Sequence, residues 1–238
     1  MFRFALVGWC LLPVMTSSVS AAVLYDFENP PYSLGNVNGQ NGWFGGGIRA
    51  NVVPQFGQQS LELQNDFTVH SLAGSGFGNV TSLSYLTAVT PNAYAELILT
   101  DSNNDSYAHV GFQDSATNDG YYIESDTSLL FTSSPVASNT IYSVNVTLDF
   151  NAQQYRAVFT DFVANTLVYD SGFVNLRRST TAALAEAGQI ELYAGAGADS
   201  GYFDNISITS VPEPTTAFLA ICGVLGFSVS RRRKLNTW

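Results

Sequence analysis

Residues 140–150, Thr-Ile-Tyr-Ser-Val-Asn-Val-Thr-Leu-Asp-Phe, decide the fold of this chain. Large apolar side chains stand at every second position from Tyr142 to Phe150, and polar ones lie between them. Successive side chains of a β-strand point to opposite faces, so this alternation predicts a strand with one face in a core and the other in water. Gln154–Phe162 repeats the pattern after a short turn at Asn151-Ala152, which predicts a β-hairpin.

The same period of two recurs between residues 23 and 210 and predicts an all-β domain there. Further strands are predicted at Val23–Glu28, Ile48–Val53, Ser60–Leu63, Val80–Val89, Ala93–Thr100, Ser106–Phe112, Tyr121–Ser125, Leu129–Thr132, Thr166–Ser171, Gln189–Ala194 and Tyr202–Thr209. Turns rich in Gly, Asn and Asp separate them, and only Thr180–Ala187 has a helical composition. Many short strands joined in this way are typical of an antiparallel β-sandwich.

Residues 1–22 have the three parts of a secretory signal peptide. Arg3 supplies a positive start, Phe4–Met15 is apolar, and Thr16–Ala22 is a stretch of small and polar residues that suits signal peptidase. We therefore expect export, and a mature chain that starts at Ala22 or Val23.

Residues 211–238 predict a short membrane-spanning tail. Its parts are Val211-Pro212-Glu213-Pro214, the uncharged apolar stretch Thr215–Ser230, and the basic end Arg231, Arg232, Arg233 and Lys234. A helix over residues 215–230 rises about 24 Å, slightly less than the ~30 Å hydrocarbon core of a bilayer. The cations favour the cytoplasmic side, which leaves everything upstream outside. The alternative is a buried C-terminal core helix, but such a helix would show a polar face.

This order of parts resembles the PEP-CTERM sorting signal, carried here by Pro212, Glu213, Pro214 and the arginines 231, 232 and 233. The resemblance implies an exported protein of a Gram-negative bacterium that forms exopolysaccharide and biofilm. In that family an exosortase in the inner membrane recognises the Pro-Glu-Pro, removes the tail and passes the protein to the cell surface or the medium. The same tail is also labelled an ice-binding-protein C-terminal domain, which by itself implies no ice binding.

The segment between the two ends is strongly acidic. All nineteen Asp and Glu residues lie between Asp26 and Glu213, together with four arginines and no lysine, which gives this segment a net charge of −15. Binding to phosphates needs clustered cations, so nucleic acid is excluded as a partner. The segment has no cysteine and therefore no disulfide, and its length suffices for one hydrophobic core.

Parts of this segment resemble a concanavalin-A-like jelly roll. They are Leu24–Glu28, Gly39–Trp43, Tyr202–Ile208, and Tyr142–Phe150 followed by Tyr155–Phe159. The resemblance implies a β-sandwich of the kind found in lectins, laminin-G-like binders and some polysaccharide hydrolases and lyases. A fold shared by so many activities specifies none of them.

Catalysis has little support in the residues. Laminarinase-type members of that fold carry Glu-x-Asp-x-x-Glu, and the nearest fragment, Glu124-Ser125-Asp126, lacks the third acid. His70 and His109 are better explained as strand-face or surface residues than as parts of a catalytic triad. We expect a non-catalytic envelope or matrix protein associated with exopolysaccharide or biofilm. The alternatives are a lectin-like carbohydrate-binding module and, third, a polysaccharide-active hydrolase or lyase.

Calcium is the cofactor that the acidic segment suits best, because Ca²⁺ prefers oxygen ligands. Asp101, Asn103 and Asp105 match the start of an EF-hand loop, but the required Gly and Glu are missing, which favours a plain hairpin turn. The jelly-roll resemblance implies a structural Ca²⁺ near the paired first and last strands. The candidate ligands there are Asp26, Glu28 and Asp204, and each of them can also be an ordinary outward strand residue.

A polysaccharide ligand would use aromatic platforms, since sugar rings stack on Trp and Tyr faces. The candidates are Trp43, in the Gly-rich stretch Gly42–Gly47, and Tyr121 and Tyr122, next to a polar turn. Trp43 has a favoured alternative as a core aromatic whose neighbouring glycines let strands approach closely.

Overall fold

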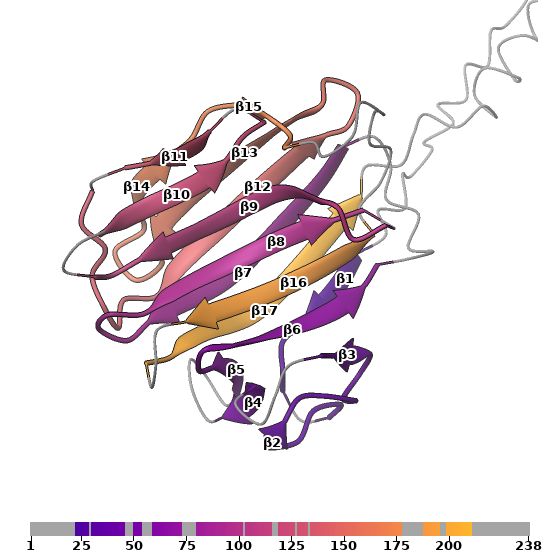
Figure 1. Ribbon diagram of the computed structural model, residues 1–238. Coiled ribbons are helices and arrows are strands. Elements are labelled where there is room, and N and C mark those ends of the chain that lie inside the picture. The colour runs from indigo at the N-terminus through magenta and orange to yellow at the C-terminus, as the bar shows by residue number, and fades with distance from the viewer. Residues whose placement is uncertain are drawn as a thin grey trace, which may run out of the picture.

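The computed structural model describes residues 22–28, 30–45, 50–53, 59–72, 80–101, 103–115, 119–126, 128–132, 134–177, 188–195 and 199–210. These residues form two antiparallel β-sheets that stack face to face as a β-sandwich, without a helix among them (Figure 1). Accordingly, this described part holds no helix able to cross a membrane. The predicted signal peptide apart from Ala22, the helical segment Thr180–Ala187 and the sorting tail 211–238 lie outside the described residues.

One sheet, called here the ten-stranded sheet, has its strands at β1 (Ala22–Tyr25), β2 (Gly35–Asn36), β4 (Ala50–Val53), β5 (Ser60–Leu63), β7 (Val80–Val89), β12 (Tyr142–Asp149), β13 (Gln154–Asp161), β14 (Thr166–Asp170), β15 (Val174–Asn175) and β17 (Gly201–Ser210). Their order is β14-β13-β12-β7-β17-β5-β4-β2, with β1 paired to β17 and β15 paired to β13.

The other sheet, called the seven-stranded sheet, contains β3 (Trp43–Phe44), β6 (Asp66–Ser71), β8 (Tyr94–Thr100), β9 (Ser106–Gln113), β10 (Gly120–Glu124), β11 (Leu129–Phe131) and β16 (Gln189–Gly195). Their order is β11-β10-β9-β8-β16-β6-β3. In Figure 1 this sheet lies in front of the ten-stranded one.

The predicted central hairpin is confirmed. β12 pairs with β13 from Tyr142↔Asp161 to Asp149↔Gln154, and buried side chains alternate with more exposed ones along both strands. Each of the other predicted strands is present, with ends shifted by a few residues.

Four strands were not predicted. β2, β3 and β15 are two residues long, which is too short to show a period. β6 lacks the alternation because its adjacent residues Thr68 and Val69 are both buried.

The core lies between the sheets and is filled by the inward half of each strand. From the ten-stranded sheet come residues such as Leu83, Val144 and Val146, and from the seven-stranded sheet Leu97, Leu192 and Ile190, all buried. Burying an aliphatic side chain of this size stabilises a fold by ~1.5–3 kcal/mol. The sandwich is therefore held together mainly by the contact between its two inner faces.

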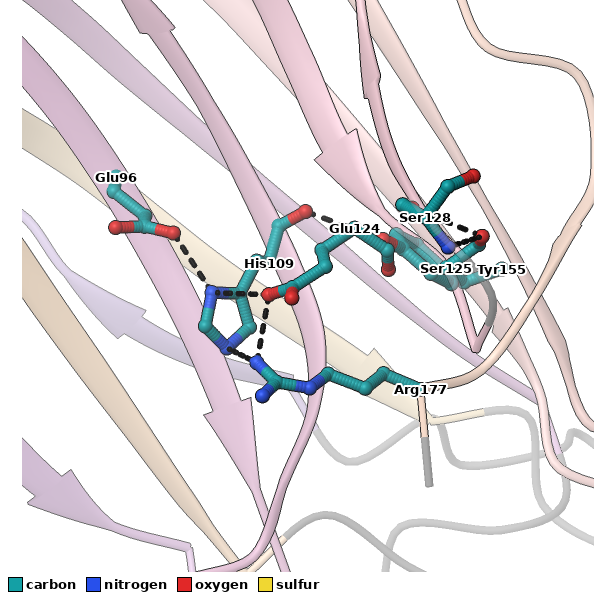
Figure 2. A network of polar contacts seen from close by, with 7 residues as sticks. All are labelled: Glu96, His109, Glu124, Ser125, Ser128, Tyr155 and Arg177. Atoms are coloured by element: carbon teal, nitrogen blue, oxygen red, sulfur yellow. Dashed lines mark hydrogen bonds and ion pairs between the residues drawn. The ribbon is translucent and has the colours of Figure 1, made fainter. Parts of the chain in front are cut away.

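Tyr155 makes a polar contact that crosses this core. Tyr155 of β13 is fully buried, and its hydroxyl donates to the backbone carbonyl of Glu124 and lies 3.1 Å from that of His109 (Figure 2). Burial raises the pKa of Tyr155, so the hydroxyl keeps the proton that it donates. This contact fixes β9 and β10 against the opposite sheet.

Strand β17 carries a β-bulge between Asp204 and Ser207, where Asn205 has a φ of 49°. Asn tolerates this left-handed conformation better than most residues do. The Asp204 carboxylate accepts hydrogen bonds from the Asn205 backbone N–H (2.7 Å) and side-chain Nδ2 (3.1 Å), yet it is only 3% exposed. Burial, together with Glu28 and Asp26 nearby, raises the pKa of Asp204 from 3.8 to about 7.

We expect Asp204→Asn to stabilise the protein at pH 8. Because the pKa of Asp204 is higher in the folded state than in the unfolded state, the wild-type protein should lose stability as the pH rises from about 4 through about 7. Asn cannot ionise, so the melting temperature of the variant at pH 8 should exceed that of wild type by at least about 3 °C. The two melting temperatures should converge near pH 4. Thermal melts from pH 4 to 8 measure this, with Asp114→Asn as a surface control. Equal melting temperatures at pH 8 would contradict the prediction.

Candidate functional site

The outward face of the seven-stranded sheet brings together residues that are far apart in the sequence. Strand register places one row of residues across six strands: Phe67, Tyr193, Glu96, Gly111, Tyr122 and Phe131. The next row is Val69, Glu191, Ile98, His109, Glu124 and Leu129. Aromatic rings therefore lie beside carboxylates and an imidazole on one surface.

Two stacked pairs of rings flank Glu96 on this face. The rings of Tyr122 and Phe131 have centroids 6.4 Å apart at an interplanar angle of 18°. Those of Tyr94 and Tyr193 are 5.7 Å apart at 25°. Stacked rings of this kind offer flat apolar surfaces next to polar groups.

Glycines let two of these rings lie close against the sheet. A Cβ atom at Gly111 would stand 2.6 Å from the ring and hydroxyl of Tyr122, and one at Gly195 would stand 2.3 Å from the hydroxyl of Tyr94. Any other residue would push the rings away from the backbone. The two glycines thus leave the space in which both tyrosine rings lie.

A polar network joins β8, β9, β10 and the residue two positions after β15 (Figure 2). Nδ1 of His109 lies 2.8 Å from Oε1 of Glu96 and 3.1 Å from Oε2 of Glu124. Nη1 of Arg177 lies 2.7 Å from the same Glu124 oxygen and 3.3 Å from Nε2 of His109. Because a guanidinium only donates, Nε2 must accept, which assigns the proton of a neutral His109 to Nδ1.

The network adjoins the aromatic rings at Tyr122, which lies near the Glu96 carboxylate. Burial, followed by the negative charge of Glu96, raises the pKa of Tyr122 well above its usual range. The half-buried Glu191 lies in the same row as His109, and burial together with Glu96 raises its pKa as well. The face therefore combines fixed donors with several carboxylate acceptors.

The arrangement does not resemble a glycosidase pair. A retaining glycosidase places the sugar carbon between two carboxyl groups ~5 Å apart. Here Glu96 and Glu124 both contact one imidazole nitrogen, so His109 occupies the position between them (Figure 2). What the cluster offers a ligand is hydrogen bonding at two partly exposed carboxylates, Glu96 (14%) and Glu124 (27%).

A depression of about 360 Å³ opens beside the Tyr122–Phe131 pair. Gln113, Tyr122, Leu129 and Phe131 line it, and Phe131 is 40% exposed. An apolar ring face next to an amide and a hydroxyl is a typical lining for a small polar ligand such as a sugar.

Three residues were predicted to form an aromatic platform on the surface, and for two of them the prediction is wrong because they are buried. Trp43 is fully buried, and its Nε1 donates to the hydroxyl of Tyr32 at 2.9 Å, so the alternative as a core aromatic is confirmed. Tyr121 is an inward residue of β10 that stacks on Tyr169 inside the sandwich. Tyr122, the next residue, faces outward and forms part of the site.

The predicted calcium ligands lie near one another where β1 meets β17. Oδ1 of Asp26 accepts from the backbone of Glu28 at 3.2 Å, and Oε1 of Glu28 accepts from the backbone of Gln59 at 3.1 Å. Both carboxylates raise the pKa of Asp204. However, no three His, Cys, Asp or Glu side chains in the described ranges are grouped closely enough to hold a metal ion. Calcium at this place stays a prediction.

The other calcium candidate is a hairpin turn, as the sequence favours. Oδ1 of Asp101 accepts from the backbone N–H groups of Asn103 (2.7 Å) and Asp105 (3.0 Å), which closes the turn between β8 and β9. The sorting residues Pro212, Glu213 and Pro214 and the arginines 231–233 lie outside the described residues.

The sequence did not single out Glu96, Glu191 and Arg177. One signal was available, because Glu96 and Glu191 stand between inward apolar residues of their strands and so face outward. Their meeting with His109 depends on the pairing of β16 with β8 and of β8 with β9, which the pattern alone does not give.

No family model and no curated protein matches this chain. Among solved structures, a sialidase is similar with a TM-score of 0.55 at 11% identity, over 80% of this chain and 19% of the sialidase, so the chain spans only about a fifth of that protein. A basic winged bean lectin with Tn-antigen has a TM-score of 0.51 at 12% identity, over 80% of this chain and 99% of the lectin. Lectin UEA-II complexed with galactose has a TM-score of 0.51 at 9% identity, over 79% of this chain and 98% of the lectin. These likenesses show the fold alone and confirm the predicted antiparallel β-sandwich, of a lectin-like kind.

Proposed function

We propose that this protein binds carbohydrate on the outward face of its seven-stranded sheet. The observation that carries the proposal is the stacked pair of Tyr122 and Phe131 at the rim of a depression, next to the Glu96–His109–Glu124 network. The fold shared with two lectins, one solved with Tn-antigen and one with galactose, supports the same function.

The chemistry of the face suits a glycan. A sugar ring stacks its apolar C–H face on the exposed ring of Phe131, and its hydroxyls donate to nearby carboxylates. Arg177 and His109 hold Glu124, and Glu96 accepts from His109, so these acceptors are oriented in advance. Because the face carries more carboxylates than cations, it favours neutral or amine-bearing sugars over acidic ones.

We expect Phe131→Ala to weaken glycan binding about tenfold, ~1.4 kcal/mol, because it removes one ring of the platform. A glycan array identifies the ligand, and titration of the purified protein measures the affinity. Phe44→Ala is the matched control, since Phe44 is exposed to a similar degree but lies on β3 at the opposite edge of the same sheet. Unchanged affinity in Phe131→Ala, or an equal loss in Phe44→Ala, would count against this face.

We propose further that the protein is exported and sorted. The signal-peptide pattern of residues 1–22 and the Pro-Glu-Pro of residues 212–214 support export, transient anchoring in the inner membrane, and release by an exosortase at the surface of a Gram-negative cell. A carbohydrate-binding domain delivered there suits a non-catalytic role in an exopolysaccharide matrix or biofilm.

Mass spectrometry of the protein recovered from cells and medium tests this sorting. We expect a mature form that lacks both the signal peptide and the tail beyond residue 214. A variant with Pro212, Glu213 and Pro214 all replaced by Ala should keep its tail and remain in the membrane fraction. Identical processing of this variant and the wild-type chain would refute the role of the motif.

Calcium is tested by melting the protein with excess Ca²⁺ and with a chelator. If Asp26, Glu28 and Asp204 hold the ion, Ca²⁺ at about 100 times its dissociation constant should stabilise the fold by ~2.7 kcal/mol, and Asp204→Asn should abolish the effect. A wild-type melting temperature that does not respond to Ca²⁺ argues against the site.

A further inference from the structure

A second depression lies on the opposite outer face of the sandwich, on the ten-stranded sheet. It measures about 240 Å³ and is lined by Ser84, Tyr85, Leu86, Ser143, Phe162 and Asn205. Strand pairing explains the grouping, because Leu86 of β7 lies between Ser143 of β12 and Asp204 of β17.

The β-bulge of β17 shapes this depression. It turns Asn205 outward in a left-handed conformation, with a φ of 49°. The Nδ2 of Asn205 donates to Asp204 at 3.1 Å, which leaves its Oδ1 to accept from a ligand. Ser84 and Ser143 add two hydroxyls that can both donate and accept.

An aromatic ring completes the lining. Phe162 begins the turn between β13 and β14 and is 53% exposed. Its backbone N–H donates to the carbonyl of Ile141 at 2.9 Å, which anchors the residue next to the start of β12. The depression thus combines one ring face, two hydroxyls and one amide, the groups that a single sugar residue needs.

Charge separates this place from the site on the other sheet. None of the six lining residues is ionised at neutral pH, although the segment between residues 26 and 213 carries a net charge of −15. The outward residues around it, such as Asn145, Thr147 and Ser207, are also uncharged. A charged ligand would find no counter-charge among these residues, because the neighbouring Asp204 carboxylate is only 3% exposed and is bound by Asn205, whereas a neutral sugar would find partners for its hydroxyls.

We propose that this depression is a second sugar site, selective for uncharged sugar residues, so that one molecule holds two glycan chains on its opposite faces. The bivalency rests on the proposed function of the seven-stranded sheet, but the second site stands on its own residues. Two sites on one rigid body turn a binding protein into a cross-linker of polysaccharide, with an avidity that neither site has alone.

The experiment counts sites by calorimetric titration of the purified protein with short neutral oligosaccharides of dextran, galactan and mannan. We expect two sites in the wild type and one each in Phe162→Ala and Phe131→Ala. Phe173→Ala is the matched control because Phe173 is also 53% exposed but lines neither depression, and it should keep both sites. Light scattering with the parent polysaccharides should show cross-linking by wild type and Phe173→Ala only.

Each outcome separates the two proposals. A single wild-type site that disappears in Phe131→Ala but survives in Phe162→Ala overturns the second site and leaves the proposed function intact. A single site that disappears only in Phe162→Ala overturns bivalency and the proposed function, while the second site stands. No heat with any of the three oligosaccharides overturns both as sites for neutral sugars. Ser143→Val, which removes a lining hydroxyl without touching Phe162, should reproduce the loss and guards against misfolding of one variant.

Discussion

The structure depends on the period of two that the pleat imposes on every strand. A side chain that fills the core, such as Val144 or Leu97, forces its neighbours onto an outer face. Strand register then decides which outward residues meet. On the seven-stranded sheet it gathers rings, carboxylates and His109, and on the ten-stranded sheet it gathers hydroxyls and amides. Both proposed sites therefore follow from the way in which one core is packed.

This explains how much the sequence could predict. Long alternating strands such as Val80–Val89 and Tyr142–Asp149 show their period within themselves, so the sandwich was predictable. The site was not, because Glu96, His109 and Arg177 meet only through pairing between distant strands. Tyr121 and Tyr122 illustrate the difference: both were candidates, and since adjacent residues point opposite ways, only one could face a ligand.

The candidate site on the seven-stranded sheet is supported both by a contact from the opposite sheet and by close packing within its own sheet. Tyr155 reaches through the core to the backbone of His109 and Glu124, while Gly111 lets the ring of Tyr122 lie close against the sheet. Groups fixed in this way lose little freedom when a ligand binds, and a rigid surface costs less to occupy than one that must be ordered first. The ligand-facing groups are thereby coupled to the stability of the whole sandwich.

The pairing of the first strand with the last has a consequence for the proposed export. β1 lies along the second half of β17, from Ala22↔Thr209 to Tyr25↔Ile206, beyond the point where the ladder with β5 ends at Phe203. An uncovered strand edge is a template for pairing with another molecule. Cleavage after Ala21 leaves all four residue pairs between β1 and β17 intact, and cleavage after Ala22 removes the pair Ala22↔Thr209. For the export proposed above, a cut inside β1 would uncover the edge of β17 at residues 206–209 and leave it open to pairing with another molecule.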